Sequence, residues 1–333
     1  MNNYRDSAPQ ILCDFLSYHE TIKAHSQKTV DEYFLDLRNF FRYMKQRRDP
    51  SLRDTSWDEI PIMDIDIAFI RTITLTDIYG YLTYLSRDRA QQPNSGKTAY
   101  GLSPATRARK IATLRSFFNY LTQKAHLLEN NPIKDLDSPK LKKDLPKYLT
   151  LDESMELLES VDGAQQERDY CIITLFLNCG LRISELIGLN LGDIQGDALR
   201  ILGKGNKVRI VYLNDACKDA LERYLAVRRP ISGRDQNALF LSSRNQRISR
   251  STVHALVKKH LSQAGLDSSE YSSHKLRHTA ATLMLQNGVD VKAVQEVLGH
   301  EHLNTTEIYT HIDNEALRVA AKANPLGKVK QKK

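Results

Sequence analysis

The stretch "DYCIITLFLNCGLRISELIGL", residues 169–189, predicts one buried helix followed almost at once by a second, shorter helix. Its first half is nearly all apolar, which is typical of a helix that lies inside a hydrophobic core. Gly180 can adopt the left-handed conformation that ends a helix, so Arg182 falls where the chain turns into "ISELIGL". We therefore expect Arg182 to point outward into a cleft.

The residues around this stretch predict a mainly α-helical domain with a small antiparallel β-sheet. Thr150 and Glu153 match a capping box, which starts a helix. Residues 197–213, "DALRILGKGNKVRIVYL", contain two apolar, β-branched runs separated by "GKGNK", a pattern typical of a β-hairpin. The stretch "ALFLSS", residues 238–243, is a candidate for one further strand.

The N-terminal part of the chain predicts a bundle of four helices. Helices are expected near residues 9–22, 28–47, 74–90 and 101–124. Within the second of these, the apolar positions recur every three or four residues, as on one buried helix face: Val30, Tyr33, Phe34, Leu37, Phe40 and Phe41. This periodicity indicates a separate helical domain with its own core.

Proline, glycine and asparagine interrupt the helical pattern in the remaining segments. We interpret residues 49–75 and 91–102 as loops or insertions. Residues 130–150 are rich in proline and lysine without a helical period, which is typical of an extended linker. The predicted division is an N-terminal helical domain at 1–135, a linker at 136–149 and a C-terminal domain at 150–333.

Length and composition narrow the class of protein. A chain of 333 residues is long enough for two domains with separate cores. The four cysteines are scattered without metal-ligand spacing, which favours reduced thiols in a cytoplasmic protein. No apolar run approaches the roughly 20 residues of a transmembrane helix, and the first residues do not resemble a secretory signal. The net charge of +8 favours polyanionic partners.

Four short stretches of the C-terminal half place charged or titratable residues at the boundaries of predicted elements. They are "CGLRISEL", "LGKGNKVR", "SSHKLRHTAATLMLQNG" and "LGHEHLNTTEIYTHI". In the third, His274 and Arg277 are three residues apart and project from the same helix face. Two arginines with an imidazole and a lysine suit a phosphate, because each guanidinium can donate to two phosphoryl oxygens at once.

This combination resembles the tyrosine recombinase (phage integrase) family. The resemblance is dense over residues 150–320, and "GKGNK" with "HKLRHTAAT" is most similar to the Xer-type recombinases. All six positions of the family's active site are filled in order: Arg182, Lys204, His274, Arg277, His300 and Tyr309. The resemblance implies a site-specific DNA recombinase that uses no metal and no ATP.

The resemblance also implies a role for each residue of this set. Tyr309 would attack a DNA phosphodiester to give a 3′-phosphotyrosine, and Lys204 would protonate the leaving 5′-oxygen. His274 would assist proton transfer, and His300 would donate a hydrogen bond to the phosphate. Four such subunits would exchange strands through a Holliday junction, as a homotetramer or with a related recombinase. Residues 314–328 would form a helix that docks into a neighbouring subunit.

The predicted helix at residues 101–124 carries five basic residues and no acidic residue. Ser103 is expected as its N-cap and Pro104 at its first position. Beside a catalytic domain that acts on DNA, we interpret this helix and the linker lysines as a phosphate-contacting surface, although a solvated face is the alternative. The candidate DNA-binding residues are Arg107, Arg109, Lys110, Arg115, Lys142 and Lys143.

Several alternatives remain open from the sequence. Lys207 lies in the same turn as Lys204, and Arg182 has Glu185 within reach as a surface ion-pair partner. The biological role is resolution of chromosome or plasmid dimers, or integration of a mobile element. A type IB topoisomerase, a non-enzymatic DNA-binding protein and a zinc hydrolase are further candidates. The last rests on five histidines between residues 274 and 311, but "KLR" between His274 and His278 lacks the glutamate of a zinc-protease helix.

Overall fold

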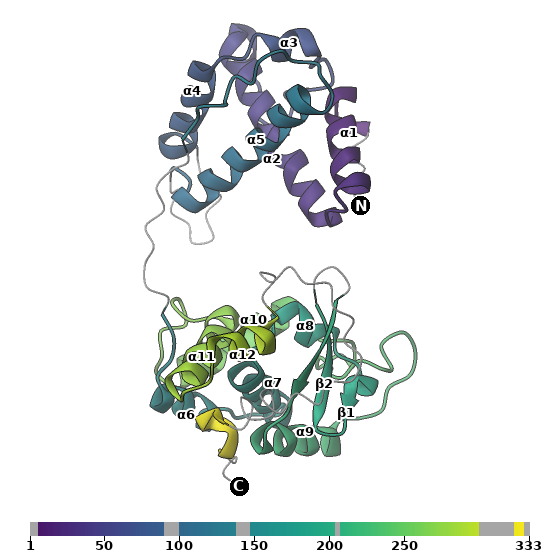
Figure 1. Ribbon diagram of the computed structural model, residues 1–333, viewed down its shortest axis with the longest axis vertical. Helices are drawn as coiled ribbons and strands as arrows, with labels where there is room; N and C mark the ends of the chain where they lie inside the picture. The colour runs from purple at the N-terminus through teal and green to yellow at the C-terminus, as the bar shows by residue number, and fades with distance from the viewer. Residues whose placement is uncertain (1–5, 90–99, 138–146, 204–206, 300–322, 330–333) are drawn as a thin grey trace. The chain divides into compact units, whose positions relative to one another are not determined.

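The computed structural model describes residues 6–89, 100–137, 147–203, 207–299 and 323–329. The chain forms two compact units, Met1–Lys143 and Asp144–Lys333, each built around its own hydrophobic core (Figure 1). No helix among the described residues is long and apolar enough to cross a membrane.

The first unit is helical, as the sequence predicts. Its α-helices are α1 (Gln10–Ser17), α2 (Gln27–Arg48), α3 (Ile67–Arg71), α4 (Leu75–Arg87) and α5 (Pro104–Gln123). A π-helical turn, Tyr18–Ile22, extends α1, and a 3-10 turn, Pro50–Leu52, follows α2. Three phenylalanines from α1, α2 and α5 meet edge to face in the core, with Phe117 packed against both Phe15 and Phe41.

The predicted starts of helices in this unit are confirmed at α5. The Ser103 hydroxyl accepts a hydrogen bond from the Thr106 amide at 3.2 Å, and Pro104 occupies the first helical position. The interpretation of residues 49–75 as a loop is wrong in part. This segment contains α3, and it buries a series of isoleucines at least 97% from solvent: Ile60, Ile62, Ile65, Ile70 and Ile73. It therefore contributes to the core because its apolar side chains have to be covered.

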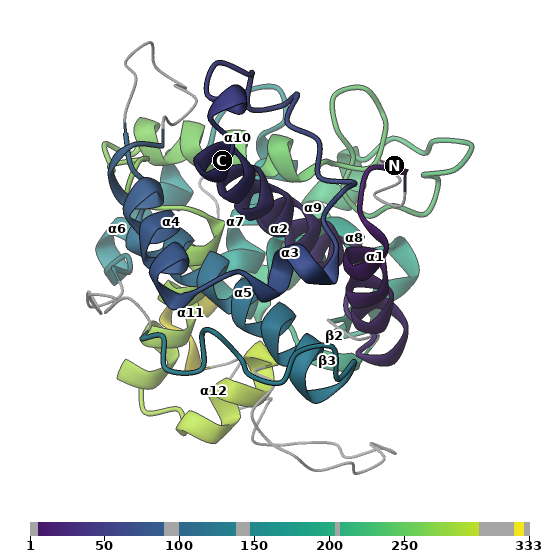
Figure 2. The same ribbon diagram turned by 90° about the horizontal axis from the view of Figure 1, so that it is seen from above.

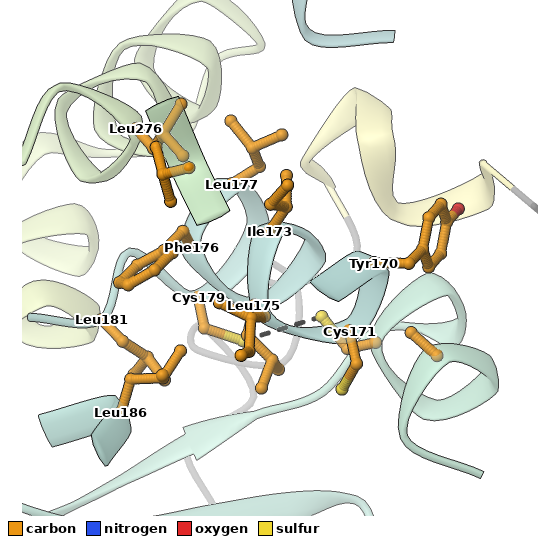
Figure 3. Close-up of a cluster of buried hydrophobic side chains, with 14 of the residues drawn as sticks. Tyr170, Cys171, Ile173, Leu175, Phe176, Leu177, Cys179, Leu181, Leu186 and Leu276 are labelled. Carbon is orange, nitrogen blue, oxygen red and sulfur yellow. Dashed lines mark hydrogen bonds between the residues drawn. The ribbon is translucent and has the colours of Figure 1, made fainter. Parts of the chain in front are cut away.

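The second unit is mainly α-helical around α7 (Gln166–Cys179). The other helices are α6 (Leu151–Glu159), α8 (Ile183–Gly188), α9 (Asp215–Val227), α10 (Arg250–Gln263), α11 (Ser273–Gln286) and α12 (Val291–Leu298). Figure 3 shows α7 in the middle of the core, with Phe176 and Leu177 directed towards Leu276 of α11. The thiols of Cys179 and Cys217 lie 3.7 Å apart, and all four cysteines are free.

A three-stranded antiparallel sheet completes this unit. Its strands are β1 (Ile194–Gln195), β2 (Ala198–Leu202) and β3 (Val208–Tyr212), in the order β1-β2-β3. The predicted hairpin is confirmed, and the Gly203 amide donates to the Lys207 carbonyl at 2.8 Å where the turn begins. Residues 238–243 are not a regular strand. They form only isolated bridges to Asn190 and Arg247, because their backbone groups pair with two different segments.

Candidate active site

Arg182 lies at a sharp turn between two helices, where the sequence predicts it. Gly180 ends α7 in the left-handed region at φ 58°. Arg182 is the N-cap of α8, and its backbone amide donates to the Glu185 carboxylate at 2.8 Å. A Cβ atom at Gly180 would lie 2.4 Å from Leu298 Cδ2, so only glycine fits this turn without a shift. The side chain of Arg182 remains 31% exposed.

Arg277 reaches the same place from α11. Its apolar neighbours on that helix, Leu276, Ala280 and Leu283, are buried. The Arg277 guanidinium donates to the Gly180 carbonyl at 2.5 Å and to the Leu298 carbonyl at 2.7 Å. Burial, and secondarily the nearby Arg182 charge, lower the pKa of Arg277 from its ordinary value to about 10. It therefore carries its positive charge at neutral pH.

Glu185 is the buried carboxylate that joins the arginines of this site. Its side chain is 3% exposed and accepts hydrogen bonds from Arg182 Nη1 at 2.8 Å and from both Nη atoms of Arg209 at 2.9 Å. Burial alone would raise its pKa, but the hydrogen bonds and charge of Arg209, with the hydrogen bonds of Arg182, lower the pKa of Glu185 to about 2. Glu185 is therefore ionised near neutral pH.

The C-terminal end of α12 is held by three arginines. Arg209 Nε donates to the Val297 carbonyl at 3.1 Å, and Arg182 Nη2 donates to the Gly299 carbonyl at 3.0 Å. Arg277 takes the carbonyl between them, that of Leu298. Cations at a helix C-terminus interact favourably with the helix dipole and satisfy its unpaired carbonyls. Figures 1 and 2 show α12 beside α11, on which Arg277 lies.

Arg182 and Arg277 retain N–H groups for a ligand. A guanidinium has five N–H donors. Among the described residues, hydrogen bonds use three donors of Arg182 and two of Arg277. The two side chains can thus bind a phosphate while the protein holds their other donors, and both carry the positive charge that such a ligand requires.

The two histidines at the start of α11 differ in exposure. His274 is exposed, one helical turn before Arg277. His278 is half-buried, and burial with the nearby Lys275 charge lowers the pKa of His278. No group of three or more potential metal ligands occurs within the part of the chain that the structure describes. His300, His302 and His311 lie outside that part.

Three of the six predicted active-site residues, Lys204, His300 and Tyr309, lie outside the described residues. The same is true of Lys142, Lys143 and most of the predicted docking segment at 314–328. Its described end forms a 3-10 turn, Pro325–Lys328, in which Leu326 is fully buried in the core of the second unit. The structure therefore brings together Arg182, Arg277 and Glu185, with His274 on the same helix as Arg277.

Sequence reasoning missed Glu185 as an organiser of the site and missed Arg209 altogether. Both left a signal. Glu185 follows Arg182 by three residues, the spacing of a capping box. Side chains alternate between the two faces of a strand. On β3, Val208 and Ile210 are exposed on one face, and Arg209 lies on the other face together with the buried Val211.

The basic helix α5 in the first unit does not present all of its cations to solvent. Lys110 is 6% exposed, and its ammonium lies 2.5 Å from the buried Asp36 carboxylate. Arg109 is 44% exposed and pairs with Asp36 and Glu32. The half-buried Arg115 donates to the Leu136 carbonyl, and Arg107 is half-buried. For Lys110 this environment favours an interior ion pair over contact with a phosphate.

Comparisons with known proteins agree with the resemblance seen in the sequence. The phage integrase family matches residues 147–316. A tyrosine recombinase XerC from Caldanaerobacter subterraneus subsp. tengcongensis is 51% identical over 319 residues, which cover 96% of this chain and 87% of that protein. A tyrosine recombinase XerC from Pelotomaculum thermopropionicum is 34% identical and covers 95% of this chain and 98% of its own length.

Solved structures support the same fold. The crystal structure of XerH site-specific recombinase bound to difH substrate, a pre-cleavage complex, superimposes with a TM-score of 0.61. It is 24% identical and covers 93% of this chain and 84% of that chain. The relatives favour the Xer-type role over the mobile-element integrase that the sequence left open. The chain belongs to the phage integrase family, and within it to the Xer-like tyrosine recombinases, which are site-specific DNA recombinases.

Proposed function

We propose that Arg182 and Arg277 clamp the scissile phosphate of a DNA recombination site and that Tyr309 is the nucleophile that attacks it. The observation that carries this proposal is the arrangement of the two arginines. They come from distant parts of the sequence, share Glu185 and the end of α12, and keep N–H donors for a ligand. Positive charge fixed in this way would stabilise the extra negative charge of a pentacoordinate phosphorus.

The proposed chemistry is a transesterification. A tyrosine phenol has an ordinary pKa near 10, so about one molecule in a thousand is ionised at neutral pH, and the arginine charges would favour that form. The phenolate oxygen of Tyr309 bonds to phosphorus while the bond to the 5′-oxygen breaks. Lys204 gives its proton to this leaving oxygen, which departs as a 5′-hydroxyl. The products are a 3′-phosphotyrosine and a free DNA end.

The remaining residues are assigned supporting roles in the same step. His274, exposed one turn before Arg277, would assist proton transfer at the phosphate. His300 directly follows Gly299, whose carbonyl accepts from Arg182, and would donate a hydrogen bond to a phosphoryl oxygen. The energy of the broken bond is kept in the phosphotyrosine, so a 5′-hydroxyl from another strand can reverse the step. Neither ATP nor a metal ion takes part.

We further propose that the N-terminal unit binds the DNA duplex through α5 and that four subunits act together on two paired sites. The tetramer contains either four copies of this chain or two copies with a related recombinase. The four free thiols suit a reducing compartment, so we place the protein in the cytoplasm. Mixing the purified chain with two labelled sites tests the composition. A paired complex with the mass of four copies supports the homotetramer, and pairing only after a related recombinase is added supports the mixed one.

A nicked suicide duplex tests the nucleophile. Loss of a short strand beyond the nick prevents religation, so cleavage accumulates as a protein–DNA adduct. We expect the wild-type adduct to form in the presence of a strong chelator and to be absent for Tyr309→Phe. Tyr271→Phe, which removes a half-buried phenol of the same unit, serves as the control and should cleave normally. An unchanged adduct in Tyr309→Phe would exclude this nucleophile, and strand cleavage that leaves no adduct and is abolished by the chelator would favour the zinc hydrolase.

A further inference from the structure

Arg209 is a charged residue on the core-facing side of strand β3. Its side chain is 16% exposed, whereas the strand neighbours Val208 and Ile210 are 52% and 37% exposed on the other face. It pairs across the sheet with Ile201, which is fully buried. Placing a guanidinium on this face costs desolvation free energy, so it requires partners inside the protein.

Those partners come from two other elements. Arg209 Nη1 and Nη2 donate to the two carboxylate oxygens of Glu185 on α8, both at 2.9 Å. Arg209 Nε donates to the Val297 carbonyl on α12 at 3.1 Å. All three nitrogens thus make contacts within the protein, in the planar, two-pronged geometry that only arginine provides. Arg209 connects β3 with α8 and with the end of α12.

The packing around Gly299 also indicates that the Arg209 side chain has a fixed position. Gly299 ends α12 in the left-handed region at φ 65°. A Cβ atom at Gly299 would lie 3.1 Å from both Cδ and Nη1 of Arg209. The absence of a side chain at Gly299 therefore leaves the space that the Arg209 side chain occupies between β3 and α12.

We propose that Arg209 is a positioning residue for Arg182 in the cleavage reaction. It fixes the Glu185 carboxylate and the end of α12, and these are the groups that hold Arg182. The inference rests on the proposed function, in which Arg182 binds the scissile phosphate. Without Arg209, Glu185 loses the two hydrogen bonds that Arg209 donates. Arg182 is then the remaining cation that donates to the Glu185 carboxylate. The Arg182 guanidinium then turns towards Glu185 and away from the phosphate.

The test measures cleavage of the nicked suicide duplex at saturating enzyme. Arg209→Ala should slow adduct formation about 10²-fold, the size of effect expected when a reacting group is misplaced by about an ångström. Arg209→Lys, which keeps the charge but not the two-pronged contact, should recover part of this loss. Arg200→Ala is the control, because Arg200 is on β2 of the same hairpin and, among the described residues, pairs with Asp193 rather than with Glu185. It should cleave at the wild-type rate.

A double-mutant cycle separates positioning of Arg182 from general loss of structure. In an Arg182→Lys background, Arg209→Ala should slow cleavage less than threefold further, because the group it positions is already changed. Effects of the two substitutions that multiply would show that Arg209 acts independently of Arg182 and would overturn the proposal. So would an Arg209→Ala adduct rate within threefold of wild type.

Two further variants keep the proposal testable if Arg209→Ala does not fold. Arg209→Lys and Gly299→Ala retain a cation at position 209, and circular dichroism establishes that each variant is folded before its rate is used. Both should slow cleavage at least tenfold while the DNA dissociation constant stays within threefold of wild type. Wild-type rates for both would overturn the positioning role. Failure of the wild-type chain itself to form an adduct would contradict the proposed function instead, so the two failures are distinguishable.

Discussion

Each unit of this protein contains a buried carboxylate surrounded by cations, and the two clusters are built differently. In the first unit, Asp36 on α2 takes Arg109, Lys110 and Thr113, all of them from α5. In the second, Glu185 takes Arg182 from its own turn and Arg209 from β3, with Arg277 of α11 at 3.9 Å. The Asp36 cluster joins two helices, whereas the Glu185 cluster joins several segments that are distant in sequence.

The two clusters differ in what the N–H donors that do not contact the carboxylate bind. Lys110 is buried and forms an ion pair with Asp36, so the Asp36 cluster fixes the packing of α5 on α2. Arg182 and Arg277 also bind backbone carbonyls at Gly180, Leu298 and Gly299, and they keep donors for a ligand. A buried ion pair is weak support for stability, but it can fix the direction of a functional group. We infer that Asp36 serves packing and Glu185 serves orientation.

The largest effects are expected from deleting the two carboxylates. Asp36→Ala and Glu185→Ala each leave buried cations unpaired, which should lower the free energy of unfolding of their own unit by about 3–5 kcal/mol. The single tryptophan, Trp57, reports on the first unit only, so its fluorescence separates the two transitions. Only Glu185→Ala should slow cleavage in addition, by about 10²- to 10³-fold. Equal loss of cleavage in folded Asp36→Ala would contradict the division of roles.

The next largest effect is a loss of the stability contributed by the Glu185 cluster at acid pH. The pKa of Glu185 is lowered from 4.5 to about 2 in the folded state, so its contribution to stability is complete above pH 4.5. That contribution, about 3 kcal/mol, is lost as the pH falls from 4.5 to 2. The measurement compares urea unfolding of wild type and Glu185→Gln between pH 4.5 and pH 2. It follows the unfolding of the second unit, which lacks Trp57. The difference in unfolding free energy should shrink towards pH 2, and a constant difference would count against the cluster.

The backbone contacts of the arginine cluster can be tested at Gly180. Gly180→Ala forces an alanine to φ 58° and brings its Cβ to 2.4 Å from Leu298, on the segment that Arg277 and Arg182 hold. Gly265→Ala is the matched control, because Gly265 has φ 72° and no atom within 4 Å of the added Cβ. Both should lose about 1–2 kcal/mol of unfolding free energy from the backbone conformation. Slower cleavage is expected for Gly180→Ala alone, and similar rates for the two variants would remove the steric argument.

The elements that position the site could be predicted from local patterns. The apolar run of α7, the glycine at position 180 and the turn at Arg182 are consecutive in sequence, so their physical causes are local. The same holds for the hairpin β2–β3 and for α11, with its buried Leu276 and Leu283. Periodicity identifies which face of a helix is buried because the spacing of its apolar residues is a property of the local sequence.

What the sequence could not provide were the partners of buried charges. Lys110 lies on the inner face of α5 with Leu114, Phe117 and Leu121, at helical spacings of four, seven and eleven residues. That spacing predicts burial, but the partner, Asp36, is 74 residues away and leaves no local signal. The contact between Arg209 and Glu185 spans 24 residues and two element types, and it too follows from the tertiary fold.

The smallest expected effect concerns DNA binding by α5 and tests whether Asp36 withholds Lys110 from the DNA. The variants are Arg107→Ala and Lys110→Met, and the measurement is the dissociation constant for a site duplex at several salt concentrations. Arg107 is half-buried and forms no ion pair with the other described residues, so we expect its charge to remain available to a phosphate. Each phosphate contact contributes about 0.9 to the slope of log K against log salt. Arg107→Ala should therefore reduce the slope by about 0.9.

Lys110→Met should leave the slope unchanged, because its ammonium is bonded to Asp36 within the protein. A double variant, Lys110→Met with Asp36→Asn, removes both charges of this pair and serves as the stability control. If Lys110→Met alone reduced the slope as much as Arg107→Ala, the lysine would have to leave Asp36 for a phosphate when DNA binds. In that case cations of the Asp36 cluster would bind both the protein and the DNA. We assign this property to the Glu185 cluster alone.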